Sequence, residues 1–186
     1  MNFLSIDIGI KNLGFAIYYQ NGSEATAFDF SLYNINDNIN NHTNSKTNVI
    51  TERCKAVKRF FESLKFKRFE AVIIERQVVN NSIACYLMYS IATEALNYTT
   101  NVIIFTPAEK FKTFQIPYST TNKQHKRLSI TLASNLITKY FPEMIHKFNS
   151  FEKKDDIADA INQLLFTELY KLNITSFRLK NKVILE

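Results

Sequence analysis

The amino-acid sequence predicts an α/β protein in which a mixed five-stranded sheet carries helices on both faces. Three observations support this fold class. Three strand-like segments follow one another at the start of the chain, two further apolar runs each follow a helical pattern, and the rest of the chain is typical of helices. With 186 residues and no internal repeat, the chain is expected to form one domain over residues 1–186.

The first three strands are expected to form a meander. Residues 2–9 and 13–19 are apolar and rich in β-branched or aromatic side chains, and a turn bounded by glycines separates them. The dipeptide Asn21-Gly22 is a hairpin signal and leads into a third strand over residues 25–33.

The middle of the chain alternates helices and strands. Residues 34–48 are rich in asparagine and lack an apolar period, which predicts a loop insertion. Residues 70–75 and 101–105 are short buried strands, and residues 82–97 form a helix between them. Another helix is predicted from Thr47, because apolar side chains recur there every three or four positions, at Ile50, Cys54, Val57, Phe61 and Leu64.

After Pro107 the chain is helical and basic. We expect a short helical turn near residues 109–114, a loop through Pro117, and helices over residues 123–140 and 155–170. The tail FRLKNKVILE forms either a short strand or an arm, and its pattern does not decide between them.

Composition narrows the class of protein. The formal net charge of +6 favours a polyanionic partner such as nucleic acid, although many basic proteins bind nothing specific. No run reaches the roughly 18 apolar residues of a membrane helix, and the first residues lack the basic start of a signal peptide. Cys54 and Cys85 fall in apolar helical patterns, which favours reduced core residues over a disulfide. We therefore expect a cytoplasmic protein that is not secreted.

Four acidic residues are the candidates for chemistry. Asp7 and Glu75 interrupt apolar strand-like runs, where an ionised carboxylate is costly unless it is paired or bound to a metal. Asp156 and Asp159 are three positions apart in a helical pattern and share a face, but Asp155 and Asp159 do so too. The residues predict an acidic cluster that holds divalent cations. The simpler alternatives are a turn cap at Asp7 and an ion pair between Glu75 and Arg76.

Three motifs resemble those of the Holliday-junction resolvases. They are DIGIKNLGFAI on the first strand, IIERQ on the fourth strand and KKDDIADA near the C-terminus. Together with the order of elements, they resemble a ribonuclease H-like fold over about residues 3–165. SIDIGIKN with ERQ and KKDDIAD is more similar to the poxvirus and fungal mitochondrial resolvases than to the bacterial RuvC enzymes, and the length favours the poxvirus branch.

The resemblance implies a metal-dependent endonuclease of four-way DNA junctions. Such an enzyme is a homodimer that nicks two opposing strands symmetrically with Mg²⁺ or Mn²⁺. In poxviruses it resolves concatemeric replication intermediates in the host cytoplasm, where viral replication proteins are further candidate partners. Two alternatives stay open: a ribonuclease H-like nuclease that acts on other branched DNA or on RNA, and a junction-binding protein without catalytic activity.

The resemblance also implies roles for individual residues. Asp7, Glu75, Asp156 and Asp159 would hold two divalent ions, with Asp156 preferred over Asp155 because the family has aspartate, two residues and aspartate. Asp155 would lie at or near the N-cap of its helix. Lys126 is the candidate catalytic lysine, because it lies about 30 residues before the aspartate pair, as in the family. His125 is expected on the surface.

DNA contacts are expected on both sides of this site, and the helix after Glu75 is the candidate dimer element. Val78 to Ser82 would approach the centre of the junction. For Tyr86, Met88 and Tyr89, core packing is favoured over a dimer interface. The residues expected to contact DNA are Lys11, Asn12, Asn80, Asn81, Lys123, Arg127, Lys153 and Lys154.

Overall fold

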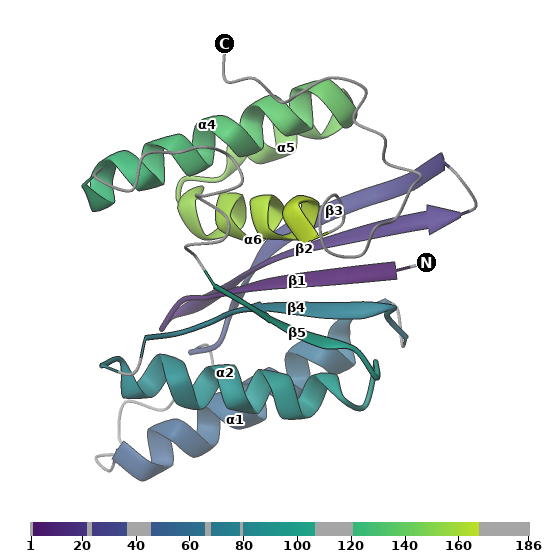
Figure 1. The fold of residues 1–186 in the computed structure, drawn as a ribbon. Coiled ribbons are helices and arrows are strands. Elements are labelled where there is room, and N and C mark those ends of the chain that lie inside the picture. Colours follow the sequence, from purple (N-terminus) through teal and green to yellow (C-terminus); the bar gives the residue numbers. More distant parts are fainter. Residues whose placement is uncertain are drawn as a thin grey trace.

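The computed structural model describes residues 2–21, 24–36, 46–65, 68–78, 80–106 and 121–167. Its centre is a five-stranded sheet in the order β3-β2-β1-β4-β5 (Figure 1). The strands are β1 (Asn2–Ile8), β2 (Asn12–Asn21), β3 (Glu24–Asn34), β4 (Ala71–Glu75) and β5 (Val102–Phe105).

The sheet is mixed, as the sequence predicts. The first three strands pair antiparallel as a meander, whereas β4 pairs parallel to β1 and β5 pairs parallel to β4. The parallel strands are joined by helical crossovers, because a parallel pair cannot be connected by a tight turn. This topology makes β1 and β4 neighbours at the centre of the sheet, although more than 60 residues separate them in sequence.

Helices cover both faces of the sheet. The helices α1 (Lys46–Ser63) and α2 (Ser82–Ala95) lie on one face. The helices α4 (Asn122–Tyr140), α5 (Ile145–Ser150) and α6 (Asp155–Phe166) lie on the other, with the short 3₁₀ helix η1 (Pro142–Met144) before α5 (Figure 1). Because α6 is the helix of its layer that packs on β1, β2 and β4, it brings its polar residues to the centre of the sheet.

Alternation along β1 separates two hydrophobic cores. Leu4, Ile6 and Ile8 pack with α1 and α2, whereas Phe3 packs with α4, α5 and α6. Successive side chains of a strand point to opposite faces, so Ser5 and Asp7 share the α6 face with Phe3.

The predicted strands and long helices are confirmed within one to four residues at each described end. The structure adds η1 and α5, which the sequence analysis missed. The six residues of α5 contain one fully buried side chain, Phe148, so they are too short to show a helical period.

Several predictions fall on parts of the chain that are not described. The helix α1 begins at Lys46, inside the predicted loop 34–48, and residues 37–45 of that loop lie outside the described residues. The same holds for the turn at residues 109–114, the loop through Pro117 and the tail after residue 167.

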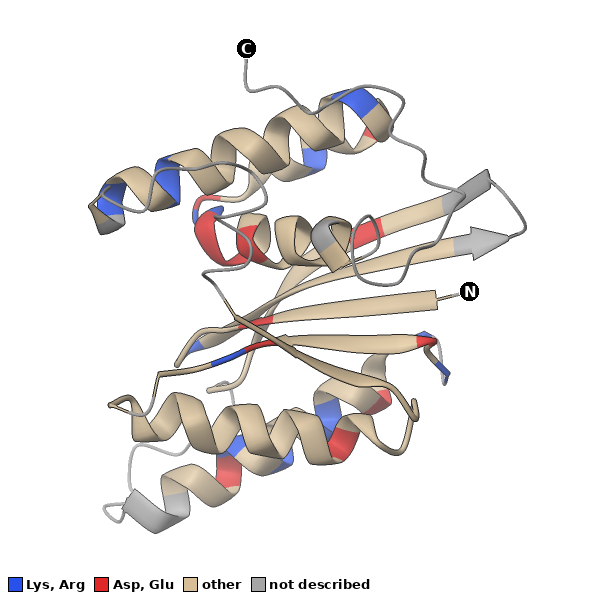
Figure 2. Ribbon diagram, viewed as in Figure 1, with Lys and Arg blue, Asp and Glu red and all other residues tan. Residues whose placement is uncertain are grey.

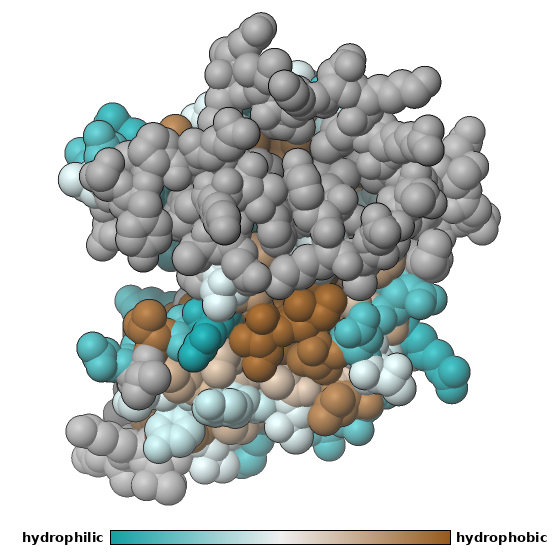
Figure 3. All heavy atoms as spheres, in the orientation of Figure 1, coloured by the Kyte–Doolittle hydropathy of each residue, from teal (hydrophilic) through white to brown (hydrophobic). Residues whose placement is uncertain are grey.

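The edge strand β5 exposes part of its apolar sequence. Figure 3 shows hydrophobic side chains gathered over β5 in this view, and Ile104 is 43% exposed. Among the described helices, none is both long and apolar enough to cross a membrane.

Candidate active site

Asp7 and Glu75 lie at the carboxyl ends of adjacent parallel strands. The β1–β4 register pairs Phe3 with Ala71 and continues to Ile6 with Ile74. One more step places Asp7 beside Glu75. Both side chains are on the face that α6 covers, because they have the strand parity of Phe3 and Ala71. Asp7 is only 7% exposed, so its ionised form requires compensation by a positive charge or hydrogen bonds.

The first turn of α6 packs directly on the β1–β2 hairpin. Gly14, the register partner of Asp7, has no room for a side chain, because a Cβ there would overlap the backbone of Asp156. A Cβ on Gly9 would lie 3.4 Å from Oδ2 of Asp156. The Asp156 carboxylate therefore lies beside the end of β1. Figure 2 shows the acidic positions of β1, β4 and α6 toward the same end of the sheet.

The two predicted metal ligands of α6 have polar partners in this structure. Lys153 Nζ lies 2.6 Å from Oδ2 of Asp156. The Ser129 hydroxyl of α4 donates to Oδ1 of Asp159 at 2.7 Å. Asp159 is thus held from the neighbouring helix, whereas Asp156 is paired by a residue three positions earlier whose side chain is 53% exposed.

Lys126 of α4, the predicted catalytic lysine, pairs with Asp155, the first residue of α6. Its Nζ is 2.6 Å from Oδ2 of Asp155, whose side chain is 13% exposed. Burial raises the pKa of the Asp155 carboxyl, but the hydrogen bond from Lys126 and the charges of Lys153 and Lys126 outweigh it and hold the pKa below its usual value. The same hydrogen bond and charge raise the pKa of Lys126.

The expectation that Asp155 lies at or near the N-cap of its helix is confirmed. Asp155 is the first residue of α6, one position after the N-cap residue Lys154. The N-cap makes no side-chain hydrogen bond, so the acidic first turn stabilises this end through the helix dipole.

The donor atoms fit a hard divalent cation. All four candidate ligands are carboxylates, and Mg²⁺ prefers oxygen ligands and retains several waters, so a few carboxylates with a substrate phosphate suffice. Within the described ranges, no three His, Cys, Asp or Glu side chains lie close enough together to hold a metal. The backbone thus gathers the acidic positions at one end of the sheet. In this structure the Asp156 carboxylate pairs with Lys153, and the Asp159 carboxylate accepts a hydrogen bond from Ser129.

Most of the residues predicted to contact DNA are exposed to solvent, and the others are half-buried. Lys11 is exposed just after β1, and Asn12 is the first residue of β2. Asn80 is exposed, but Asn81 caps α2, since its side-chain oxygen accepts from the Ala84 N–H at 3.2 Å. Lys123 and Arg127 of α4 and Lys153 before α6 are exposed, and Lys154 is half-buried.

The favoured core packing is correct for Met88 and wrong for two tyrosines. Met88 is 5% exposed, and its sulfur accepts from the Gln77 N–H at 3.4 Å. Tyr86 and Tyr89 are 54% and 62% exposed, because their positions face away from the sheet. Val78, near the expected junction centre, is 71% exposed.

Two further side-chain predictions are settled in part. His125, expected on the surface, is half-buried at the first turns of α4. Both cysteines are free, as predicted, but partly buried rather than fully buried.

The sequence analysis missed the residues that support Asp159. They are Ser129 and the fully buried Asn162, which contacts Ser129. A signal was present, since Lys126 and Ser129 share a face of α4 and Asp155, Asp159 and Asn162 share a face of α6.

Sequence comparison assigns the family. Residues 1–170 match the family described as Poxvirus A22 protein. The chain belongs to this family. A direct comparison with curated protein sequences found no match for this A22 family member.

Solved structures establish the fold of this A22 family member. The crystal structure of the fowlpox virus Holliday junction resolvase is 23% identical, with a TM-score of 0.62 over 91% of this chain and 98% of that chain. The complex of the fowlpox virus resolvase with substrate Holliday junction DNA is also 23% identical, with a TM-score of 0.62 over 92% and 100%. RuvC of Thermus thermophilus is 16% identical, with a TM-score of 0.59 over 91% and 95%. The predicted ribonuclease H-like fold is confirmed.

Proposed function

We propose that the protein is a metal-dependent Holliday junction resolvase, which nicks two opposing strands of a four-way DNA junction. One observation carries the proposal. Asp7 and Glu75 stand side by side at the ends of β1 and β4, and the first turn of α6 packs Asp156 against the same hairpin. This arrangement occurs in a member of the Poxvirus A22 protein family that shares its fold with the fowlpox virus resolvase.

The acidic residues of this site would hold Mg²⁺ or Mn²⁺. Two such ions supply an activated water and stabilise the charge on the leaving oxygen in phosphodiester hydrolysis. Asp7 would be the central ligand, because it is flanked by Glu75 on β4 and by Gly14 and Asp156 on the other side. Asp159, one helical turn after Asp156, completes the set.

Cationic side chains would bind the DNA backbone around the acidic end. Lys11, Lys123 and Arg127 are exposed. Lys126 is placed to offer its charge to a phosphate at the first turn of α6, since 59% of its side chain is exposed while it pairs with Asp155. The net charge of +6 supports such contacts, which depend on salt because phosphate binding releases counterions.

A two-fold dimer would match the two incisions. The α1–α2 layer is the candidate interface, because it lies on the opposite face of the sheet from α6 and exposes Tyr86 and Tyr89. An isologous dimer through this layer would present one active site for each of two opposing strands. Resolution of viral concatemers in the host cytoplasm is the biological role we propose for this activity.

Cleavage of a labelled four-way junction tests the function. We expect the purified protein with Mg²⁺ to yield nicked duplexes, and Asp7→Asn and Glu75→Gln to bind the junction without cutting it. Glu143→Gln in η1 is the matched control, because it removes an exposed carboxylate on a different element.

Other outcomes would select a different activity. Equal cutting of linear duplex or of an RNA–DNA hybrid would exclude a junction resolvase in favour of a less selective ribonuclease H-like nuclease. Junction binding by the wild type without any metal-dependent cutting would indicate a non-catalytic binding protein.

A further inference from the structure

We infer that Ser129 and Asn162 are positioning residues that hold the Asp159 carboxylate for metal binding. This inference rests on the proposed function, in which Asp159 is a metal ligand. It concerns two residues that lie outside the acidic cluster and that the sequence analysis did not name.

A chain of short hydrogen bonds connects the three side chains. Ser129 Oγ lies 2.7 Å from Asp159 Oδ1. Asn162 Nδ2 lies 2.8 Å from Ser129 Oγ and 2.9 Å from the Ser129 carbonyl oxygen. One residue of α4 thus connects two residues of α6 that are three positions apart.

The direction of each hydrogen bond follows from the chemistry of the groups. The Ser129 carbonyl oxygen can only accept, so the amide of Asn162 must present Nδ2 to it. The same Nδ2 then donates to Ser129 Oγ, which leaves the hydroxyl proton for Asp159. An ionised carboxylate accepts only, so the hydroxyl is fully directed at Oδ1. The Asn162 amide therefore sets the orientation of the Ser129 hydroxyl, and that hydroxyl sets the orientation of the carboxylate.

Burial makes this chain of contacts hard to replace. Ser129 is 3% exposed and Asn162 is 0% exposed. Water has little access to substitute for either side chain. Buried side chains near this contact on α4 and α6 are apolar, among them Leu132, Ala133, Ala158 and Ile161. Apolar side chains would pack the α4–α6 contact without any polar group, so a buried hydroxyl aimed at a carboxylate indicates a role beyond adhesion of the helices.

Two further contacts hold the N-terminal part of α4, on which Ser129 lies. A capping box of Thr121 and Gln124 fixes the start of α4, two turns before Ser129. The ion pair between Lys126 and Asp155 joins α4 to α6 about one helical turn before Ser129. These contacts fix the position of Ser129 relative to α6, which a positioning residue requires.

Mn²⁺ binding measured by calorimetry provides the test, with Ser129→Ala as the variant and Ser134→Ala as the matched control in the same helix. Loss of a side chain that orients a metal ligand typically weakens metal affinity about 10- to 100-fold. We expect about a 10-fold weaker Mn²⁺ affinity for Ser129→Ala and for Asn162→Leu, with Ser134→Ala unchanged. The Mg²⁺ concentration for half-maximal junction cutting should rise by a similar factor, while junction binding without metal stays constant.

A double-mutant comparison separates positioning from general stability. On an Asp159→Asn background, we expect Ser129→Ala to cause no further loss of Mn²⁺ affinity, because its effect passes through Asp159. An equal loss on both backgrounds would overturn the inference, as would wild-type Mn²⁺ binding by Ser129→Ala. If the wild type fails to cut junctions but Ser129→Ala still weakens Mn²⁺ binding, the nuclease activity is excluded, whereas the metal-binding role of Asp159, on which the inference depends, is supported.

Discussion

Asp155 and Asp156 are consecutive residues with different surroundings. Asp155 faces Lys126 on α4, whereas Asp156 lies against Gly9 and Gly14 of the β1–β2 hairpin. Successive helical positions are turned by about 100°, so only one of the two can face the sheet. The spacing of acidic residues allows either to accompany Asp159, and the packing of α6 favours Asp156.

Cleavage by two single variants tests this choice. Asp156→Asn is expected to reduce the rate of junction cutting by at least about 100-fold, since it removes a carboxylate beside Asp7. Asp155→Asn is expected to stay within about threefold, because an ion pair with an exposed lysine contributes little energy. Single-turnover cleavage at saturating Mg²⁺ measures both. A larger loss for Asp155→Asn than for Asp156→Asn would reverse the assignment.

The pair of Lys126 and Asp155 should make stability depend on pH in a defined window. The folded-state pKa of Asp155 is below its ordinary value of 3.8, so its contribution is present above that pH and is lost as the pH falls. The folded-state pKa of Lys126 is above its ordinary value of 10.5, so its contribution is lost as the pH rises beyond that value.

Urea unfolding in metal-free buffer checks this window. Asp155→Asn is expected to lower the free energy of unfolding at pH 7 by about 0.5 kcal/mol, because Lys126 is largely exposed and solvent screens the pair. The difference from the wild type should shrink as the pH falls below 3.8. A difference that is unchanged at pH 2.5 would contradict an ionic origin.

At the scale of elements, the contact between α6 and β2 determines the geometry of the site. Gly14 lies opposite Asp7 in the antiparallel ladder, and the backbone of Asp156 occupies the place that a side chain would take. The absence of a side chain at this position allows α6 to approach the sheet closely. The residues that bear the carboxylates on β1 and α6 are thereby brought together.

Gly14→Ala tests this approach. The added methyl group would meet backbone atoms of Asp156, which cannot rotate away as a side chain can. We expect a loss of about 1–3 kcal/mol in unfolding free energy, which is typical of overpacking, and a loss of cutting that exceeds the loss of folded protein. Ser31→Ala on the neighbouring strand β3 is the control. Wild-type cutting by Gly14→Ala would show that this close approach is dispensable.

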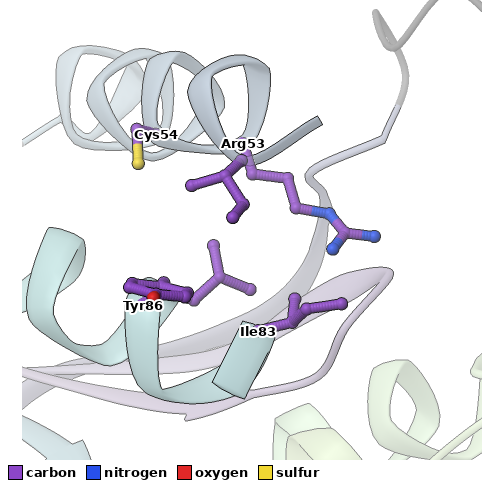
Figure 4. Close-up of a pocket in the computed structure, with 6 residues that line it drawn as sticks. Arg53, Cys54, Ile83 and Tyr86 are labelled. Carbon is purple, nitrogen blue, oxygen red and sulfur yellow. The ribbon is translucent and has the colours of Figure 1, made fainter. Parts of the chain in front are cut away.

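At the scale of the whole molecule, the two faces of the sheet have different surfaces. The face covered by α4 and α6 carries the acidic positions, whereas the α1–α2 layer on the other face exposes aromatic side chains. Figure 4 shows Cys54 of α1 and Tyr86 of α2 facing one another across a small pocket, with Arg53 extending away from it. A shallow groove between the same helices includes Tyr89. Exposed tyrosines beside a groove are typical of protein interfaces.

Sedimentation of charged variants tests the dimer. Tyr86→Glu with Tyr89→Glu is expected to convert a dimer into monomers and to abolish paired incisions, because an interface core excludes unpaired charge. Thr131→Glu on the exposed side of α4 adds the same charge to the other face and should leave the dimer intact. A wild-type monomer at working concentration, or a dimer that tolerates both tyrosine changes, would contradict this interface.

The sequence by itself determined the elements and their order. The strands over residues 2–8 and 71–75 follow from short apolar runs, and the long helices follow from apolar side chains that recur every three or four residues. Both patterns are local properties of the chain. The four acidic candidates also follow locally, because a carboxylate in a buried strand or a helical pair stands out against its neighbours. The short helix α5 has no such period, and the exposed faces of α2 have no pattern that separates surface from core.

Only the tertiary structure decided how the acidic positions meet and what orients them. The rotation of α6 that turns Asp156 to the hairpin and Asp155 to Lys126 depends on Gly14, more than 140 residues earlier in the chain. The contact of Ser129 with Asp159 likewise depends on how α4 lies along α6. Such contacts join residues distant in sequence through packing and hydrogen-bond geometry, which no local pattern of residue types encodes.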